Sequence, residues 1–287
     1  DWDGTITQKD TLDTLVSIAA STKPEFPTMH HWQRVSKAYV QEYTAALEQL
    51  APDGALPNTV QEEKQLLSKL RDIEARSISR VSSSAIFAGL TSQALKTGAQ
   101  QAIASRHVQL RNGFSSFLEG IQSQPHHGVV ILSVNWSRHF IQSCLEASGA
   151  TVPLHAILAN QLDNMCSDEP STGHIVPTNA GDRDLILSSG DKLARMQEIR
   201  GHKVYVGDSW TDMECLLAAD LGICMRDHPM GTSQKQLAHA LERLGIACPR
   251  LSDCHELNNS RVAWASDFAE IRDWMENTSA QTCTDSI

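Results

Sequence analysis

The second half of the chain alternates short apolar runs with helix-like stretches, and this alternation most constrains the fold. The apolar runs lie at 129–132, 204–206, 221–225 and 262–265, with a further candidate strand at 155–162. The helix-like stretches between them lie at 137–148, 192–199 and 212–219. Such alternation is typical of a buried parallel sheet with helices on both faces. We therefore expect residues from about 107 to 275 to form a doubly wound α/β fold.

Residues 8–105 have a different character, with helical spacing and no strand-like run. Apolar side chains recur every three or four positions at 32–50 and again at 66–73. This is the pattern of amphipathic helices. We therefore expect an all-helical cap at 8–105, inserted into a Rossmann-like core formed by 1–7 and 106–287.

The acidic balance of the chain restricts the partners it can take. There are 34 Asp and Glu against 24 Lys and Arg, a formal net charge of -10 at pH 7. Nucleic acids and anionic membranes select clustered basic side chains, so neither is expected as a partner. The seven cysteines are scattered without a CxxC pair, and no apolar run approaches the length of a membrane span. We therefore expect a cytoplasmic protein, in a reducing compartment.

Two carboxylates open the chain, in the sequence DWDGT at 1–5. Asp1 and Asp3 stand at positions i and i+2, which share one side of an extended segment, and Gly4 lets the chain turn away behind them. An aspartate can be the nucleophile of phosphoryl transfer. A second can protonate the leaving oxygen and later deprotonate water. Asp1 and Asp3 are therefore candidate catalytic residues, although an acidic turn is the simpler alternative.

Two further candidates stand at the ends of predicted elements. Ser133 follows the run at 129–132, where a hydroxyl and the next backbone N–H groups can hold a phosphate oxygen. Lys192 opens a predicted helix, and its ammonium group can offset the charge of a transferring phosphoryl group. Taken singly, a serine such as Ser133 is more often a turn residue or a helix cap. A single lysine such as Lys192 is more often solvated.

A second acidic motif, GDSWTD at 207–212, follows another predicted strand. Asp208 ends that strand, and Asp212 lies in the first turn of the next helix. Carboxylates suit Mg²⁺, which takes one or two of them and keeps several waters; helix capping is the alternative role. If the sheet forms, Asp1, Asp3 and Asp208 meet at one edge. Their repulsion would raise their pKa values unless a divalent cation were bound there.

In this order, the four motifs resemble the signature of the haloacid dehalogenase (HAD) superfamily. The chain is most similar to the phosphoserine-phosphatase-like branch, which carries a helical cap between its first two motifs. The segments IFAGLT at 86–91, VQLRNGF at 108–114 and LANQL at 158–162 also look like parts of that branch. The resemblance covers most of the chain and implies a HAD-like α/β core with a cap that closes over the substrate.

The resemblance also implies a role for each motif residue. Asp1 would be the nucleophile and Asp3 the acid/base, which binds the metal through its carbonyl oxygen. The phosphate-binding residues implied are Ser133, Val134, Asn135 and Lys192. The Mg²⁺ ligands implied are Asp1, Asp3, Asp208 and Asp212, the last as an additional or indirect ligand.

Two features depart from the branch that the chain resembles. The residues after Ser133 are Val134, Asn135 and Trp136, where the branch has small glycines. They would reshape the pocket, so phosphoserine itself is not the expected substrate. The strand that precedes the first aspartate in the family is not part of this sequence, which suggests that an upstream segment has been removed. We therefore expect a gap in the middle of the sheet.

The sequence thus predicts a Mg²⁺-dependent phosphatase that hydrolyses a small phosphorylated metabolite, a phosphomonoester, through an aspartyl-phosphate. A HAD-fold binding or scaffold protein without catalysis stays open as an alternative. A hydrolytic dehalogenase is less favoured, because it needs neither Asp3 nor the metal carboxylates. The pattern does not determine the substrate or the oligomeric state.

Overall fold

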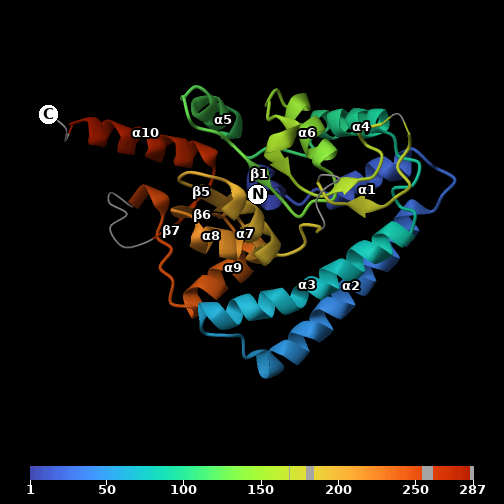
Figure 1. Ribbon diagram of the computed structural model, residues 1–287, viewed down its shortest axis with the longest axis horizontal. Coiled ribbons are helices and arrows are strands. Elements are labelled where there is room, and N and C mark those ends of the chain that lie inside the picture. The colour runs from blue at the N-terminus through green and yellow to red at the C-terminus, as the bar shows by residue number, and fades with distance from the viewer. Residues whose placement is uncertain (168, 179–183, 254–260, 285–287) are drawn as a thin grey trace.

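The computed structural model describes residues 1–167, 169–178, 184–253 and 261–284, with side chains as far as residue 277. Within these ranges the chain forms an α/β core from which a long helical hairpin projects (Figure 1). The helices are α1 (Leu12–Ser21), α2 (Thr28–Leu50), α3 (Val60–Ser83), α4 (Ser92–Ala104), α5 (Phe114–Gln122), α6 (Arg138–Ala147), α7 (Ser189–Glu198), α8 (Met213–Ala218), α9 (Thr232–Arg243) and α10 (Phe268–Thr284).

The strands of the core form short ladders. The strands are β1 (Ile131–Leu132), β2 (Ile157–Leu158), β3 (Gln161–Leu162), β4 (Ile175–Val176), β5 (Val204–Gly207), β6 (Leu221–Met225) and β7 (Val262–Ala265). Strands β5, β6 and β7 lie parallel in that order, β1 and β2 form a second parallel pair, and β3 and β4 form an antiparallel pair. The predicted strands at 221–225 and 262–265 are confirmed. The candidate strand at 155–162 instead divides into β2 and β3, because Asn160 between them is hydrogen-bonded to neighbouring loops.

Helices cover both faces of the parallel strands. On β6, Ile223 packs into one hydrophobic cluster, together with Phe140 of α6 and Phe268 of α10. The next residue, Cys224, packs into a second cluster with α8 and α9. Because successive strand residues point to opposite faces, each face of the sheet has its own core. The predicted doubly wound α/β architecture is therefore confirmed.

The first residues of the chain lie between the two parallel groups of strands. The backbone nitrogen of Asp1 donates to the carbonyl of Val206 in β5 at 2.9 Å. On the other side, the Asn135 side chain, three residues beyond β1, donates to the Asp3 carboxylate. Residues Trp2–Ile6 form a tight turn with Gly4 at φ 71°. Among the described residues, no ladder joins β1 to β5.

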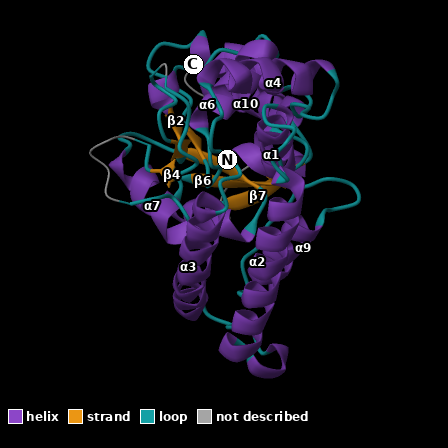
Figure 2. Cartoon of the chain, turned by 90° about the vertical axis from the view of Figure 1, so that its right-hand side faces the viewer, coloured by secondary structure: helices purple, strands orange, loops and turns teal. Residues whose placement is uncertain are grey.

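Residues 12–104 contain helices and no strand, as the spacing predicts. Helices α2 and α3 form an antiparallel hairpin that reaches well beyond the core (Figure 2). Helix α4 instead packs against α6 on the core, and α1 packs against α4. The projecting part is thus the α2–α3 hairpin, and the limits of the cap at 8–105 stay a prediction.

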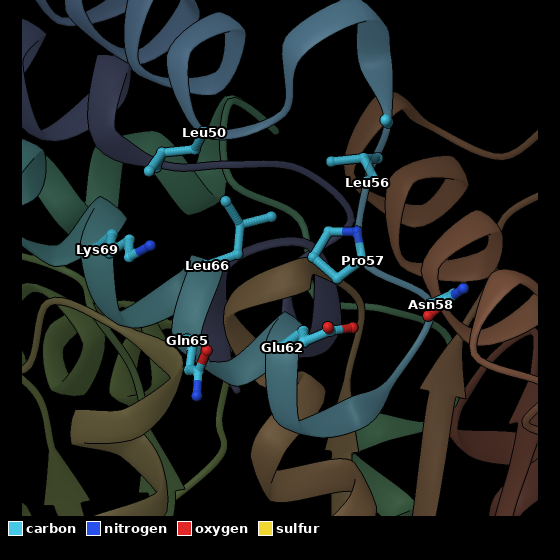
Figure 3. A pocket seen from close by; sticks show the side chains of 9 residues that line it. Leu50, Leu56, Pro57, Asn58, Glu62, Gln65, Leu66 and Lys69 are labelled. Atoms are coloured by element: carbon cyan, nitrogen blue, oxygen red, sulfur yellow. The ribbon is translucent and has the colours of Figure 1, made fainter.

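The turn of this hairpin holds an open cavity of about 350 Å³ (Figure 3). Leu50, Leu56, Pro57 and Leu66 supply its apolar lining, and Glu62 and Lys69 are among its polar residues. None of the predicted catalytic or metal-binding residues lines it. In the described part of the chain, no helix has both the length and the apolar character required to cross a bilayer.

Candidate active site

Three aspartates from two distant parts of the chain meet beside the carboxyl end of β5. Carboxylate oxygens of Asp1, Asp208 and Asp212 all lie within 4.8 Å of one another. The side chain of Asp1 is 6% exposed and that of Asp212 fully buried. The fold therefore brings the two acidic motifs together, as the sequence predicts. The carboxylate of Asp3 is not part of this group.

Lys192 provides the positive charge of the group. Its ammonium group is fully buried at the start of α7, 3.0 Å from Asp1 Oδ1 and 2.7 Å from Asp212 Oδ1. A capping box between Ser188 and Asp191 fixes the first turn of α7 and so the direction of Lys192. Near Asp1, this ammonium group can also hold an oxygen of an incoming phosphoryl group.

Asp212 uses both of its carboxylate oxygens within the protein. Oδ1 accepts from Lys192 Nζ at 2.7 Å and from Tyr205 Oη at 2.6 Å. Oδ2 accepts from the backbone N–H and the hydroxyl of Ser209 and from the backbone N–H of Asp208. Burial opposes ionisation, but Lys192 and these hydrogen bonds hold the pKa of Asp212 at about 2. Its geometry suits a residue that orients the loop better than a direct metal ligand.

Asp1 and Asp208 have more lone pairs to offer. Asp1 Oδ1 is buried and accepts no well-aligned hydrogen bond, even though Lys192 is near. Asp208 accepts one side-chain hydrogen bond, from Thr5 Oγ1 at 3.0 Å. Burial and the nearby Asp212 raise the pKa of Asp208 to about 7. A buried carboxylate with a raised pKa and a neighbouring unsatisfied carboxylate oxygen fit a hard divalent cation such as Mg²⁺.

Gly4 is what allows the first motif to approach the second. A Cβ atom built at this position would lie 2.3 Å from Asp208 Oδ2. Its φ of 71° also lies in the left-handed region that favours glycine. The glycine of DWDGT therefore has two roles, a turn and a close contact with a candidate metal ligand.

The carboxylate of Asp3 lies in a separate environment of neutral hydrogen-bond donors. Oδ1 accepts from the backbone N–H and the hydroxyl of Thr11, at 2.8 and 2.6 Å. Oδ2 accepts from the side-chain amide of Asn135 at 2.8 Å. Burial and the nearby Asp10 raise the pKa of Asp3 to about 6, although the hydrogen bonds from Asn135 and Thr11 oppose this. A carboxyl group that titrates near neutrality suits general acid/base catalysis.

The predicted phosphate-binding loop lies directly after β1. Ser133 is fully buried, and its hydroxyl accepts from the backbone N–H of Asn135 at 3.1 Å. The backbone carbonyl of Val134 accepts from Asn160. Trp136 packs edge-on against Trp32 of α2, at 5.8 Å between ring centroids. Two of the three residues that stand where the branch has small glycines thus contact Asp3 and helix α2.

Several residues around the site were not among the site residues predicted from the sequence. Thr5, Thr11 and Tyr205 hydrogen-bond Asp208, Asp3 and Asp212, respectively. Asn160 is fully buried and donates to the carbonyls of Val134 and Ile186, which joins the Ser133 loop to the segment before Lys192. Thr5 lies in the first acidic motif and Asn160 in the segment 158–162, so the sequence marked both segments without giving these two residues a role. Thr11 and Tyr205 become visible as site residues only in the fold.

The fold and the site define an α/β protein whose candidate active site lies at the carboxyl ends of parallel strands. Comparison with curated proteins adds a relative in Schizosaccharomyces pombe, a CTO1 family protein. It is 33% identical over 240 residues, which cover 79% of this chain and 81% of the relative. The chain belongs to the CTO1 family.

Other comparisons are less informative. No protein-family model matches the chain. Among solved structures, the chain is similar to a substrate-bound phosphoserine phosphatase and to a phospho-aspartyl intermediate analogue of phosphoserine phosphatase. Each match covers 96% of this chain and 95% of the other chain. Their sequence identities are 14% and 16%, and the TM-scores are 0.46 and 0.47.

Proposed function

We propose that this chain is a Mg²⁺-dependent phosphatase that hydrolyses a small phosphomonoester through an aspartyl-phosphate on Asp1. The observation that carries the proposal is the convergence of Asp1, Asp208 and Lys192 from three distant segments. A nucleophilic carboxylate, a candidate metal ligand and a buried ammonium group are the parts that phosphoryl transfer requires.

In the first step, a carboxylate oxygen of Asp1 attacks phosphorus while the bond from phosphorus to the ester oxygen breaks. Asp3, in its protonated form, gives its proton to the leaving oxygen, and the alcohol departs. In the second step, ionised Asp3 takes a proton from water, whose oxygen attacks phosphorus. The bond from phosphorus to Asp1 breaks, inorganic phosphate leaves and both aspartates return to their starting states.

The other residues bind and orient. Lys192 and the Ser133 hydroxyl would hold phosphoryl oxygens, and Asp212 would keep Lys192 in place through their 2.7 Å contact. Mg²⁺ held by Asp1 and Asp208 would neutralise charge on the phosphoryl group. The site residues Lys192, Ser133 and Asp212 are fully buried, which strengthens each of these electrostatic interactions.

The proposal is tested by turnover of a panel of phosphate esters by the intact protein, with Mg²⁺ or with a chelator, beside the variant Asp1→Asn. We expect hydrolysis of at least one ester, its loss with chelator, and a fall of about a thousandfold or more in kcat for Asp1→Asn. Hydrolysis that survives chelation, or an unaffected Asp1→Asn variant, rejects the mechanism. Binding of phosphate esters without turnover would favour the scaffold alternative, and halide release from haloacids would favour a dehalogenase.

A further inference from the structure

A carboxylate on cap helix α3 is fully buried against the core. Glu63 is 0% exposed. Its Oε1 accepts from the indole N–H of Trp210 at 2.8 Å, and Arg243 of α9 donates to both carboxylate oxygens at 2.8 and 3.0 Å. A buried carboxylate needs such partners, because an unpaired one is strongly destabilising.

Trp210 connects this carboxylate to the candidate metal site. It stands midway between Asp208 and Asp212, in the segment 207–212, which we call the acidic loop. The Trp210 side chain is 4% exposed and packs in the hydrophobic cluster of α8 and α9. The indole N–H is the single polar group of this side chain, and Glu63 is the acceptor that it finds.

The acidic loop is tight, so a displacement at Trp210 would move its aspartates. The backbone N–H groups of Asp208 and Ser209 both donate to the carboxylate of Asp212, and Trp210–Asp212 form a single 3₁₀ turn. Trp210 is thus inside a small hydrogen-bonded ring that holds Asp208, the candidate metal ligand, and Asp212. A shift of even 1 Å in such a site can cost a large factor in activity.

We propose that Glu63 is a positioning residue that couples cap helix α3 to the acidic loop through Trp210 and thereby sets the affinity of the site for Mg²⁺. The inference rests on the proposed function, since it assumes that the acidic loop holds the metal. Glu63 lies outside all four sequence motifs. In the sequence it is one of two adjacent glutamates in the first turn of a helix.

Two ion pairs of α3 also reach the core, at residues outside the acidic loop. Arg71 lies 3.0 Å from Asp191 in α7, and Lys64 lies 3.8 Å from Glu214 in α8. These ion pairs would keep the cap docked whether or not Glu63 acts on the loop. A purely structural role of Glu63 therefore predicts lower stability without a change in metal affinity.

The test uses three single variants of the intact protein, one double variant and one control variant, with two readouts. Mg²⁺ affinity is measured by titration calorimetry, without substrate, and stability is measured by thermal unfolding in the absence of Mg²⁺. Glu63→Ala removes the carboxylate and so both of its contacts, with Trp210 and with Arg243. Trp210→Phe removes only the indole N–H and leaves the Glu63–Arg243 ion pair. Glu63→Gln keeps an oxygen that accepts from Trp210 but loses the ion pair.

We expect the dissociation constant for Mg²⁺ to rise about tenfold in both Glu63→Ala and Trp210→Phe, the factor that one buried hydrogen bond to a charged group supplies. Glu63→Gln should lower the melting temperature and leave Mg²⁺ affinity within about threefold of wild type. The double variant should bind Mg²⁺ no more weakly than either single variant, because both act through one contact. Arg76→Met, which removes an ion pair from α3 to α2, is the matched control and should leave Mg²⁺ affinity unchanged.

Unchanged Mg²⁺ affinity in Trp210→Phe, or in a folded Glu63→Ala, overturns the inference, whatever happens to the melting temperature. If Glu63→Ala does not fold, Trp210→Phe and Glu63→Gln decide between the two roles. Failure of the proposed function has a different signature. In that case the wild-type protein itself shows no Mg²⁺-dependent turnover, and Asp1→Asn matches it.

Discussion

The two aspartates of DWDGT lie two residues apart, yet they occupy opposite electrostatic environments. Asp1 lies among charges, with Asp208, Asp212 and the buried ammonium group of Lys192 around it. Asp3 is held by neutral donors, the amide of Asn135 and both donors of Thr11. The first environment favours an ionised nucleophile beside a cation, whereas the second permits a proton to come and go near neutral pH. In the proposed mechanism, one residue type thus acquires two roles from its surroundings.

The largest effect on activity in this comparison is expected from substitution of Asp3, the proposed proton-transfer residue. In Asp3→Asn we expect kcat to fall by about 10²- to 10⁴-fold, because the amide can neither protonate the leaving group nor activate water. Some phosphoenzyme should still form with an activated ester such as an aryl phosphate, and it should persist. Intact-protein mass spectrometry after quenching detects it, and Asp1→Asn, which lacks the nucleophile, is the control. Phosphoenzyme on Asp1→Asn, or none on Asp3→Asn, would contradict the assignment of roles.

A second prediction concerns the charged environment of Asp1, in which Asp208 has a raised pKa. Because that pKa is about 7 in the folded protein, against about 4 in an unfolded chain, the folded state retains a proton that the unfolded state releases. Without metal, the free energy of unfolding should therefore fall as pH rises from about 4 to about 7, by up to about 4 kcal/mol from this group.

Asp208→Asn should remove that part of the pH dependence, measured by urea unfolding with and without Mg²⁺. In the wild-type protein, Mg²⁺ at a hundred times its dissociation constant should restore about 2.7 kcal/mol at pH 7.5. The variant should show no such gain. A wild-type protein that Mg²⁺ does not stabilise would mean that Asp208 does not bind the cation. A variant with an unchanged slope would mean that the pKa of Asp208 is not raised in the folded protein.

These environments were only partly predictable from the sequence. The strands at 221–225 and 262–265 are continuous apolar runs, which burial on both faces of a sheet requires, so they could be located directly. The convergence of the four motifs follows from the topology, since parallel strands end at one edge of a sheet. The different environments of Asp1 and Asp3 could not be predicted, because Trp2–Ile6 form a turn in place of an extended segment.

Contacts between helix α3 and the core were also beyond the sequence. Helical spacing predicts α3, but its first turn is acidic and looks solvated. The burial of Glu63 depends on Trp210 and Arg243, which lie 147 and 180 residues further along the chain. Local pattern carries no information on partners at that separation, and the same holds for Asn160, whose side chain joins two loops of the core.

A smaller effect is expected where the two acidic motifs touch. In Gly4→Ala, the left-handed φ alone should lower the free energy of unfolding by about 1–2 kcal/mol, and the new Cβ atom would also displace Asp208. Gly54→Ala is a matched control, because Gly54 has φ 72° and nothing within 4 Å of the added atom. We expect Mg²⁺ affinity to fall in the first variant and to stay unchanged in the second. Equal losses of stability, with equal Mg²⁺ affinity, would argue against a close contact at Gly4.

The smallest effect is expected from substitution of Asn135, which is one of the neutral donors to Asp3, and it concerns the pKa of Asp3. Its hydrogen bond lowers the pKa of Asp3, so Asn135→Ala should raise that pKa by about half a unit to one unit. Formation of the phosphoenzyme needs protonated Asp3 and its hydrolysis needs the ionised form. The pH profiles of phosphoenzyme formation and of phosphoenzyme hydrolysis should therefore both move to higher pH. Single-turnover rates measured across pH would show this shift. Asn112→Ala, which removes a similar amide contact to Asp267 on the surface, should leave both profiles in place. If the two variants behave alike, the pKa of Asp3 is not set by Asn135, and the neutral environment of Asp3 is not what separates it from Asp1.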